Sequence, residues 1–188
     1  MNVGILLNNI QELKLFLPLS EILEKKFNTI FFVDHMKSFS SKKVYYIPTK
    51  DRLNQYLKKK KIFFSTPSEL VFLLKKNNIK KIYAVFWKSY YNLRKNDLKV
   101  QWNMVSLGHD TYQRGNLENL NECSRILTTT KYNDISANKF LLRRIDGYSK
   151  SEKKILLKKL KKKFIPVGNI GLNNQKILNK KKILKKYK

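Results

Sequence analysis

Histidine is the side chain best suited to proton transfer near neutral pH, and this chain has two. One of them, His109, lies in VSLGHDTYQRG (residues 105–115), where a short apolar run leads into a polar turn that also contains Asp110 and Thr111. The other, His35, follows the apolar run FFV. Ligands of parallel α/β sheets bind beyond the carboxyl ends of the strands, so a histidine there is a candidate catalytic residue. Capping or hydrogen bonding within a loop is the alternative role of His109.

Motifs for the common cofactors are absent from the sequence. It contains no P-loop, no G-x-G-x-x-G fingerprint and no H-E-x-x-H zinc helix. Two histidines cannot supply a three-histidine zinc site, and the 13 Asp and Glu residues are too scattered for a carboxylate cage. Cys123 is the only cysteine, which excludes an internal disulfide and predicts a small buried apolar side chain. We therefore expect no metal site.

The net charge of +28 suggests a nucleic-acid partner, but the kind of basic residue argues against one. Only six of the 41 basic residues are arginines, and arginine is the residue that grips phosphates and bases in a planar fork. Lysine, asparagine and isoleucine also have A/T-rich codons, so the base composition of the gene explains part of the charge. Nucleic acid is therefore not the expected partner.

Targeting and membrane signals are weak. No apolar run is long enough to span a bilayer, and the N-terminus lacks a basic segment before an apolar one. The expected location is the cytoplasm. Peripheral contact with the anionic inner face of the membrane is an option, because residues 151–162 and 175–188 form basic amphipathic segments. Docking of these helices on the sheet, with a solvated basic face, is the alternative.

Apolar runs alternate with amphipathic segments along the whole chain. Continuous apolar runs are typical of strands buried on both faces of a parallel sheet. The expected strands are Met1–Leu7, Thr29–Val33, Lys43–Ile47, Lys61–Phe64, Ile82–Phe86, a short strand with Val105 and Leu107, and Arg125–Thr129, with a further short strand beginning at Phe164. The pattern predicts an α/β fold, a Rossmann-like doubly wound and mainly parallel sheet with helices on both faces. Arg125–Thr129 is expected to be the final strand of the main sheet.

Helix starts are marked by polar caps. Thr66 is the expected N-cap of a helix that begins at Pro67, with Glu69 closing a capping box. Ser151 is the expected N-cap of the lysine-rich helix at 151–162. Because the composition changes at this helix, we divide the chain into a Rossmann-like domain at 1–148 and a basic helical segment and linker at 149–188.

Three segments together resemble a known family. They are NVGILLNN with LKLFLPLSEILEKKFNTIFFV, the turn SLGHDT, and RILTTTKYN with the later FIPVGNIGLNNQKILNKKKILKKY. Their order resembles the N-terminal half of GT-B-type glycosyltransferases and CDP-glycerol glycerophosphotransferases, with the UDP-sugar 2-epimerases as a further branch. The resemblance implies one half of a GT-B fold. It also implies a function: binding the acceptor hydroxyl of a cell-envelope glycan or polymer that receives a glycosyl or glycerophosphate group.

The resemblance assigns roles to residues of this chain. His109 would be the general base or a transition-state stabiliser, and Asp110 would orient it. The implied substrate-binding residues are Asn8, Asn9, Trp87, Lys88, Thr111 and Lys131. Gly168 and Asn169, in the sequence VGN, would lie at the entry to the nucleotide-binding half. The donor, a nucleotide-sugar or a CDP-alcohol, is expected only with a second domain, so we expect this chain to be an enzyme fragment that is incomplete alone. No other cofactor is implied.

The alternative function is a basic α/β module that binds nucleic acid or an anionic membrane surface. It depends on the net charge and on the aromatic pairs Tyr45-Tyr46 and Tyr90-Tyr91, which together with Trp87 could stack on bases. Packing in the core is the other role of these aromatic residues, because they lie in or beside apolar runs. A third interpretation is a remnant domain without activity.

Overall fold

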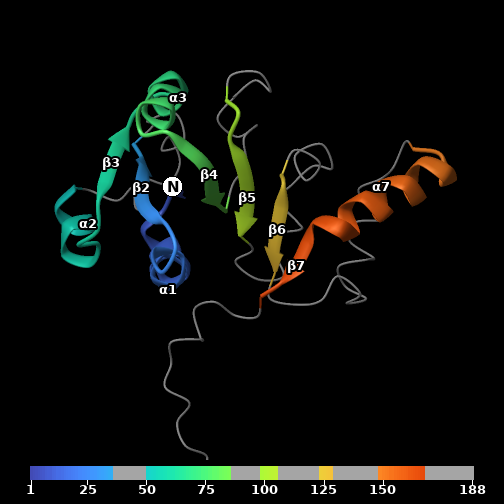
Figure 1. Cartoon of the computed structure of the whole chain (residues 1–188), viewed down its shortest axis with the longest axis horizontal. Coiled ribbons are helices and arrows are strands. Elements are labelled where there is room, and N and C mark those ends of the chain that lie inside the picture. The colour runs from blue at the N-terminus through green and yellow to red at the C-terminus, as the bar shows by residue number, and fades with distance from the viewer. Residues whose placement is uncertain (36–49, 86–97, 106–122, 129–147, 168–188) are drawn as a thin grey trace, which may run out of the picture.

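The computed structural model describes residues 1–35, 50–85, 98–105, 123–128 and 148–167. Within these residues, seven strands form a single parallel sheet in the order β3-β2-β1-β4-β5-β6-β7, and Figure 1 shows them side by side. The strands are β1 (Asn2–Leu7), β2 (Asn28–Asp34), β3 (Lys61–Phe64), β4 (Ile79–Ala84), β5 (Gln101–Val105), β6 (Arg125–Thr128) and β7 (Phe164–Pro166). The predicted Rossmann-like α/β fold is confirmed.

Helices cover both faces of this sheet, as the sequence predicted. The described helices are the short 3-10 helix η1 (Ile10–Glu12), α1 (Leu13–Glu24), α2 (Lys50–Tyr56), α3 (Pro67–Lys76) and α7 (Lys150–Lys163). One hydrophobic cluster joins α1 and α2 to alternate residues of β1 and β2. A second cluster joins α3 to the opposite face of the same strands and to β4. This arrangement follows from right-handed crossovers that proceed in opposite directions from β1.

The centre of the sheet is fully buried, which explains the unbroken apolar runs of its strands. Val3, Ile5, Leu6 and Leu7 of β1 have no exposed surface. Gly4 lies in the same strand, and a Cβ atom there would come within 3.1 Å of Ile82 Cγ1 and Phe32 Cε2. The absence of a side chain at this position therefore allows β1 to pack closely between its neighbours.

Of the two predicted N-cap residues, Thr66 is confirmed and Ser151 is not. Thr66 is the N-cap of α3, and its Oγ1 accepts a hydrogen bond from Glu69 N at 3.1 Å. The Glu69 carboxylate accepts from Ser65 N at 2.7 Å, one residue before the cap, so the expected capping box is shifted. For α7 the prediction was wrong, because Ser149 rather than Ser151 is the N-cap. A capping box needs an acid three residues after the cap, and Glu152 meets that condition only for Ser149.

The end of the sheet also differs from the expectation. β6 is not the last strand, because β7 pairs with it in parallel at Ile126↔Phe164 and Thr128↔Pro166. Residues 164–166 therefore extend the main sheet, while the division of the chain at residue 149 stays a prediction.

Pro18 lies inside α1, which begins at Leu13. The expected strand at 43–47 and the basic segment 175–188 lie outside the described residues.

Candidate functional site at the carboxyl edge of the sheet

The strand order places a ligand-binding edge at the ends of β1 and its neighbours. β2 and β3 lie on one side of β1, and β4 to β7 lie on the other. In open parallel sheets of this kind, ligands bind beyond the carboxyl ends of the strands near the point where the order reverses. The register Leu7↔Val33 brings Asn8, which follows β1, beside Asp34, the last residue of β2. These ends are the candidate site.

The turn after β1 is closed by its own side chains. Asn9 has an extended backbone (φ −146°), and its Oδ1 accepts a hydrogen bond from Gln11 N at 2.9 Å. Glu12 Oε2 accepts from Asn8 N at 2.9 Å, and Glu12 N donates to the Asn9 carbonyl at 3.0 Å. Dinucleotide-binding folds instead leave these amides open to a pyrophosphate through a glycine-rich turn. The amino end of the first helix in this chain is therefore unsuited to a diphosphate.

Glu12 is the most unusual titratable group of this edge. Its side chain is only 3% exposed. Burial raises the pKa of the Glu12 carboxyl to about 8, and the nearby Asp34 charge adds to the increase. Hydrogen bonds from Asn8 and Asn9 oppose this increase only partly. The Glu12 carboxyl is therefore mostly protonated and neutral at pH 7, and it is a hydrogen-bond donor as well as an acceptor.

The sequence analysis did not identify Glu12, although its spacing contains a signal. Glu12 precedes the buried residues Phe16, Leu19 and Leu23 by four, seven and eleven positions, which puts it on the buried face of the helical segment. An acidic residue on an apolar face directly after a strand is a recognisable pattern of a buried carboxyl group.

His35 lies at the same edge, directly after β2. Its backbone N donates a hydrogen bond to the Phe64 carbonyl at 2.8 Å, which extends the pairing of β2 with β3 by one residue. The imidazole is half-buried and packs edge-on against the Phe63 ring, with ring centroids 4.7 Å apart. Lys50 Nζ lies 5.4 Å from the centroid of the same Phe63 ring. The edge thus places an imidazole one residue from the Asp34 carboxyl.

The structure describes two of the predicted site residues. Asn8 and Asn9 lie at the carboxyl edge and both are half-buried, while their substrate-binding roles stay predictions. The chain leaves β4 at Ala84 and β5 at Val105, at this same edge. The other predicted site residues lie outside the described residues, and their roles stay predictions: His109, Asp110, Trp87, Lys88, Thr111, Lys131, Gly168 and Asn169.

No family model matches the chain. No curated protein matches it either. Among solved structures, it is similar to the crystal structure of a "predicted subunit of tRNA methyltransferase" from Methanocaldococcus jannaschii, with 13% identity. The match covers 89% of this chain and 67% of that chain, with a TM-score of 0.27. Such a low TM-score supports no conclusion about this protein.

The described groups suit a ligand rich in hydroxyl groups. Amide, carboxyl and imidazole side chains lie at the ends of β1 and β2, and Lys50 is the basic side chain that the described contacts place beside them, on the Phe63 ring. Within the described segments, no group of three or more His, Cys, Asp or Glu residues could hold a metal ion. Cys123 is 2% exposed, so the predicted buried thiol is confirmed. The chemistry available at this edge is therefore hydrogen bonding to neutral polar groups.

Proposed function

We propose that this domain is the acceptor-binding half of a GT-B-type transferase. The transferase moves a glycosyl or glycerophosphate group from a nucleotide donor to a hydroxyl group of a cell-envelope glycan or polymer. The observation that supports this proposal is the set of Asn8, Glu12, Asp34 and His35 at the carboxyl ends of β1 and β2. Their hydrogen-bonding groups match the hydroxyl groups of a polyol or a sugar.

The closed turn after β1 favours an acceptor over a nucleotide donor. A departing nucleotide gathers negative charge, which cations or free amides at a helix N-terminus stabilise. Here Asn9 Oδ1 and Glu12 Oε2 already accept from the turn amides, and the Asp34 carboxyl lies near Glu12. The donor nucleotide in this proposal binds to a second domain.

The reaction assigned to the complete enzyme is a displacement at carbon or phosphorus. The acceptor oxygen forms a bond to the anomeric carbon or to the glycerol-bearing phosphorus. The bond to the nucleotide breaks, and the nucleotide leaves with the electron pair. The acceptor proton passes to the proposed base, His109, while Asp110 orients its ring. Asn8, Asp34 and His35 hold the neighbouring hydroxyl groups, and Glu12 is a positioning residue because it is buried beneath Asn8.

The experiment is an NMR titration of the full chain with two classes of ligand. Polyol and glycan acceptor fragments should shift the amide signals of residues 8–12 and 34–35, whereas CDP-glycerol and UDP-sugars should not. Loss of two to three hydrogen bonds in Asp34→Ala should weaken acceptor binding by about tenfold or more. Asn54→Ala, an exposed change on α2, is the matched control and should leave binding unchanged.

Two results would contradict this proposal. Nucleotide-dependent shifts at residues 8–12 would make this edge the donor site. Robust transfer to an acceptor by the chain alone would show that no second domain is needed.

A further inference from the structure

Helix α7 has a concentrated positive charge that the described structure does not neutralise. Eight of its 14 residues are lysines, and its one acidic residue is Glu152. Glu152 is engaged in the N-terminal capping box, where its Oε2 accepts from Ser149 N at 2.8 Å. Among the described residues, the single salt bridge joins Lys59 Nζ to Glu24 Oε2 at 2.6 Å, far from α7 in sequence. Within the described part of the chain, no salt bridge is formed by five of these lysines, namely Lys150, Lys154, Lys158, Lys161 and Lys162.

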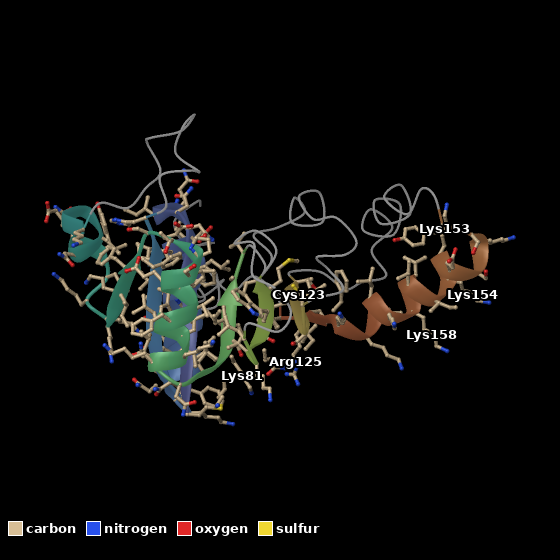
Figure 2. The ribbon with its side chains drawn as sticks, turned by 90° about the horizontal axis from the view of Figure 1, so that it is seen from above. Lys81, Cys123, Arg125, Lys153, Lys154 and Lys158 are labelled. Carbon is tan, nitrogen blue, oxygen red and sulfur yellow. The ribbon has the colours of Figure 1, made fainter. Side chains whose placement is uncertain are left out.

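Five of these lysines share one side of the helix. With 3.6 residues per turn, they fall within about 120° of the helix circumference, and all five are exposed. We call this group the lysine stripe: Lys150, Lys154, Lys158, Lys161 and Lys162. Lys154 and Lys158 extend from one side of α7 and Lys153 from a different side (Figure 2). The stripe extends over about 18 Å of helix length.

The opposite side of α7 is apolar. Leu160 is fully buried there and Leu156 is half-buried, whereas the half-buried Leu157 lies at the margin of the stripe, about 20° from Lys150 around the helix. Figure 1 shows that α7 continues outward past β7, beyond the edge of the sheet. The lysine stripe thus lies on a helix that is folded, capped and open to large partners, so binding would not require the helix to form first.

We propose that the lysine stripe binds the surface of an anionic lipid bilayer, with α7 lying parallel to that surface. A cluster of lysines on one helix side is the arrangement that attracts anionic headgroups, and each lysine near such a surface strengthens partitioning by about fivefold. Ile155 is 60% exposed beside Lys154 in the sequence and offers one apolar side chain to the interface. This proposal is independent of the transferase proposal, because α7 contains none of its site residues.

The composition of α7 favours lipid over nucleic acid. The helix has no arginine and no aromatic residue, so it lacks both the bidentate base reader and the stacking platform of nucleic-acid sites. Lysine is a compact point charge that needs no particular orientation of its partner, which suits a fluid layer of headgroups. Within the described segments, no helix combines the length and apolar character needed to cross a bilayer. Binding through the stripe is therefore peripheral.

The test is co-sedimentation of the full chain with vesicles made of equal parts phosphatidylglycerol and phosphatidylcholine. The wild-type chain should bind them at low salt, release them at high salt, and ignore pure phosphatidylcholine vesicles. Replacing four stripe lysines by glutamine should lower the partition coefficient by about 100-fold or more. The variant is Lys150→Gln, Lys154→Gln, Lys158→Gln and Lys162→Gln.

A matched control removes four exposed lysines elsewhere on the described surface. It consists of Lys25→Gln, Lys26→Gln, Lys58→Gln and Lys75→Gln, and it has the same net charge as the stripe variant. The control should lose less than about tenfold, and arginine at the four stripe positions should preserve binding. Circular dichroism checks that each variant is folded.

Three outcomes would overturn the proposal. In the first, the folded stripe variant binds the anionic vesicles as the wild type does. In the second, the control loses as much affinity as the stripe variant, so that net charge alone explains binding. In the third, a single-stranded oligonucleotide binds more tightly than the vesicles and displaces them, which would assign the stripe to nucleic acid.

Discussion

Ionisable side chains are buried at the carboxyl edge of the sheet and exposed on helix α7. At the edge, Glu12 and Asp34 are only 3% and 6% exposed, and the turn around them is fixed by hydrogen bonds. On α7, the lysines of the stripe extend into solvent. A buried ionisable group changes the stability of the fold, because its charged form must be desolvated. An exposed charge has little effect on folding and is available to an external partner. The buried charges of the carboxyl edge are therefore part of the folded core, whereas the exposed lysines of α7 are suited to binding an external surface.

Helix dipoles explain some of the lysines but not the whole stripe. Two helices carry lysines in their last turns: Lys75 and Lys76 in α3, and Lys161–Lys163 in α7. There they interact favourably with the partial negative charge of the helix terminus. Lys150 and Lys154 lie in the first turns of α7, where the dipole is unfavourable for a cation. Their presence is not explained by helix stability, which is consistent with a binding role.

The pH dependence of folding gives the sharpest test of this comparison. The pKa of the Glu12 carboxyl is about 8 in the folded chain, against an ordinary value of 4.5. Between these values the folded state binds more protons than the unfolded state, so stability falls as pH rises from 4.5 to 8. The loss is as large as about 5 kcal/mol. Glu12→Gln cannot ionise and should show none of this loss when urea unfolding is measured at pH 5 and at pH 8.5.

Glu21→Gln is the control for the pH experiment. Glu21 is an exposed glutamate on α1, so its replacement should leave the steep pH dependence of the wild type in place. If the wild type and Glu12→Gln lost stability in parallel, the buried carboxyl would not be the group responsible.

Two core substitutions compare how firmly the regions are anchored. Phe16 is fully buried on α1 beneath the turn after β1, and Phe16→Ala should lower the free energy of unfolding by about 3–5 kcal/mol. Leu160 is the one fully buried residue among those of α7, and Leu160→Ala should cost about 2 kcal/mol. Amide hydrogen exchange should then become faster across the whole domain in Phe16→Ala. In Leu160→Ala it should become faster mainly in α7 and β7. Equal exchange throughout both variants would contradict a separately anchored α7.

Much of the fold was predictable because continuous apolar runs indicate strands that are buried on both faces. The strands β1 and β2 were identified within one residue at each end, whereas β4 begins three residues before its expected start. Pairing of β7 was not predictable, because a strand of three residues gains its stability from the neighbouring β6 rather than from its own pattern. Glu12 was missed for a related reason. Its spacing from the buried residues of α1 indicates a buried carboxyl, but the size of the pKa increase depends on the desolvation imposed by the packed helix and strands.

The capping boxes provide a prediction of intermediate size. Ser149→Ala removes the hydroxyl that accepts from Glu152 N at 3.3 Å, and should lower stability by about 1 kcal/mol. Thr66→Ala should cost a similar amount in α3, whereas Ser151→Ala should cost far less because Ser151 is not the cap. Urea unfolding of the three variants measures the order. A larger loss for Ser151→Ala than for Ser149→Ala would restore the original assignment of the cap.

The smallest predicted effect has the opposite sign and tests the exposed side of the comparison. Lys150, Lys154, Lys158 and Lys162 follow one another at intervals of four residues, and like charges at that spacing destabilise a helix by about 0.2–0.5 kcal/mol per pair. Lys154→Gln removes two such contacts, so it should stabilise the free protein slightly, and added salt should reduce the gain. Thermal unfolding at low and high salt measures both. A destabilised Lys154→Gln would mean that this lysine has a partner in the folded chain. A small gain in stability together with weaker vesicle binding would instead place the favourable interactions of the stripe outside the protein.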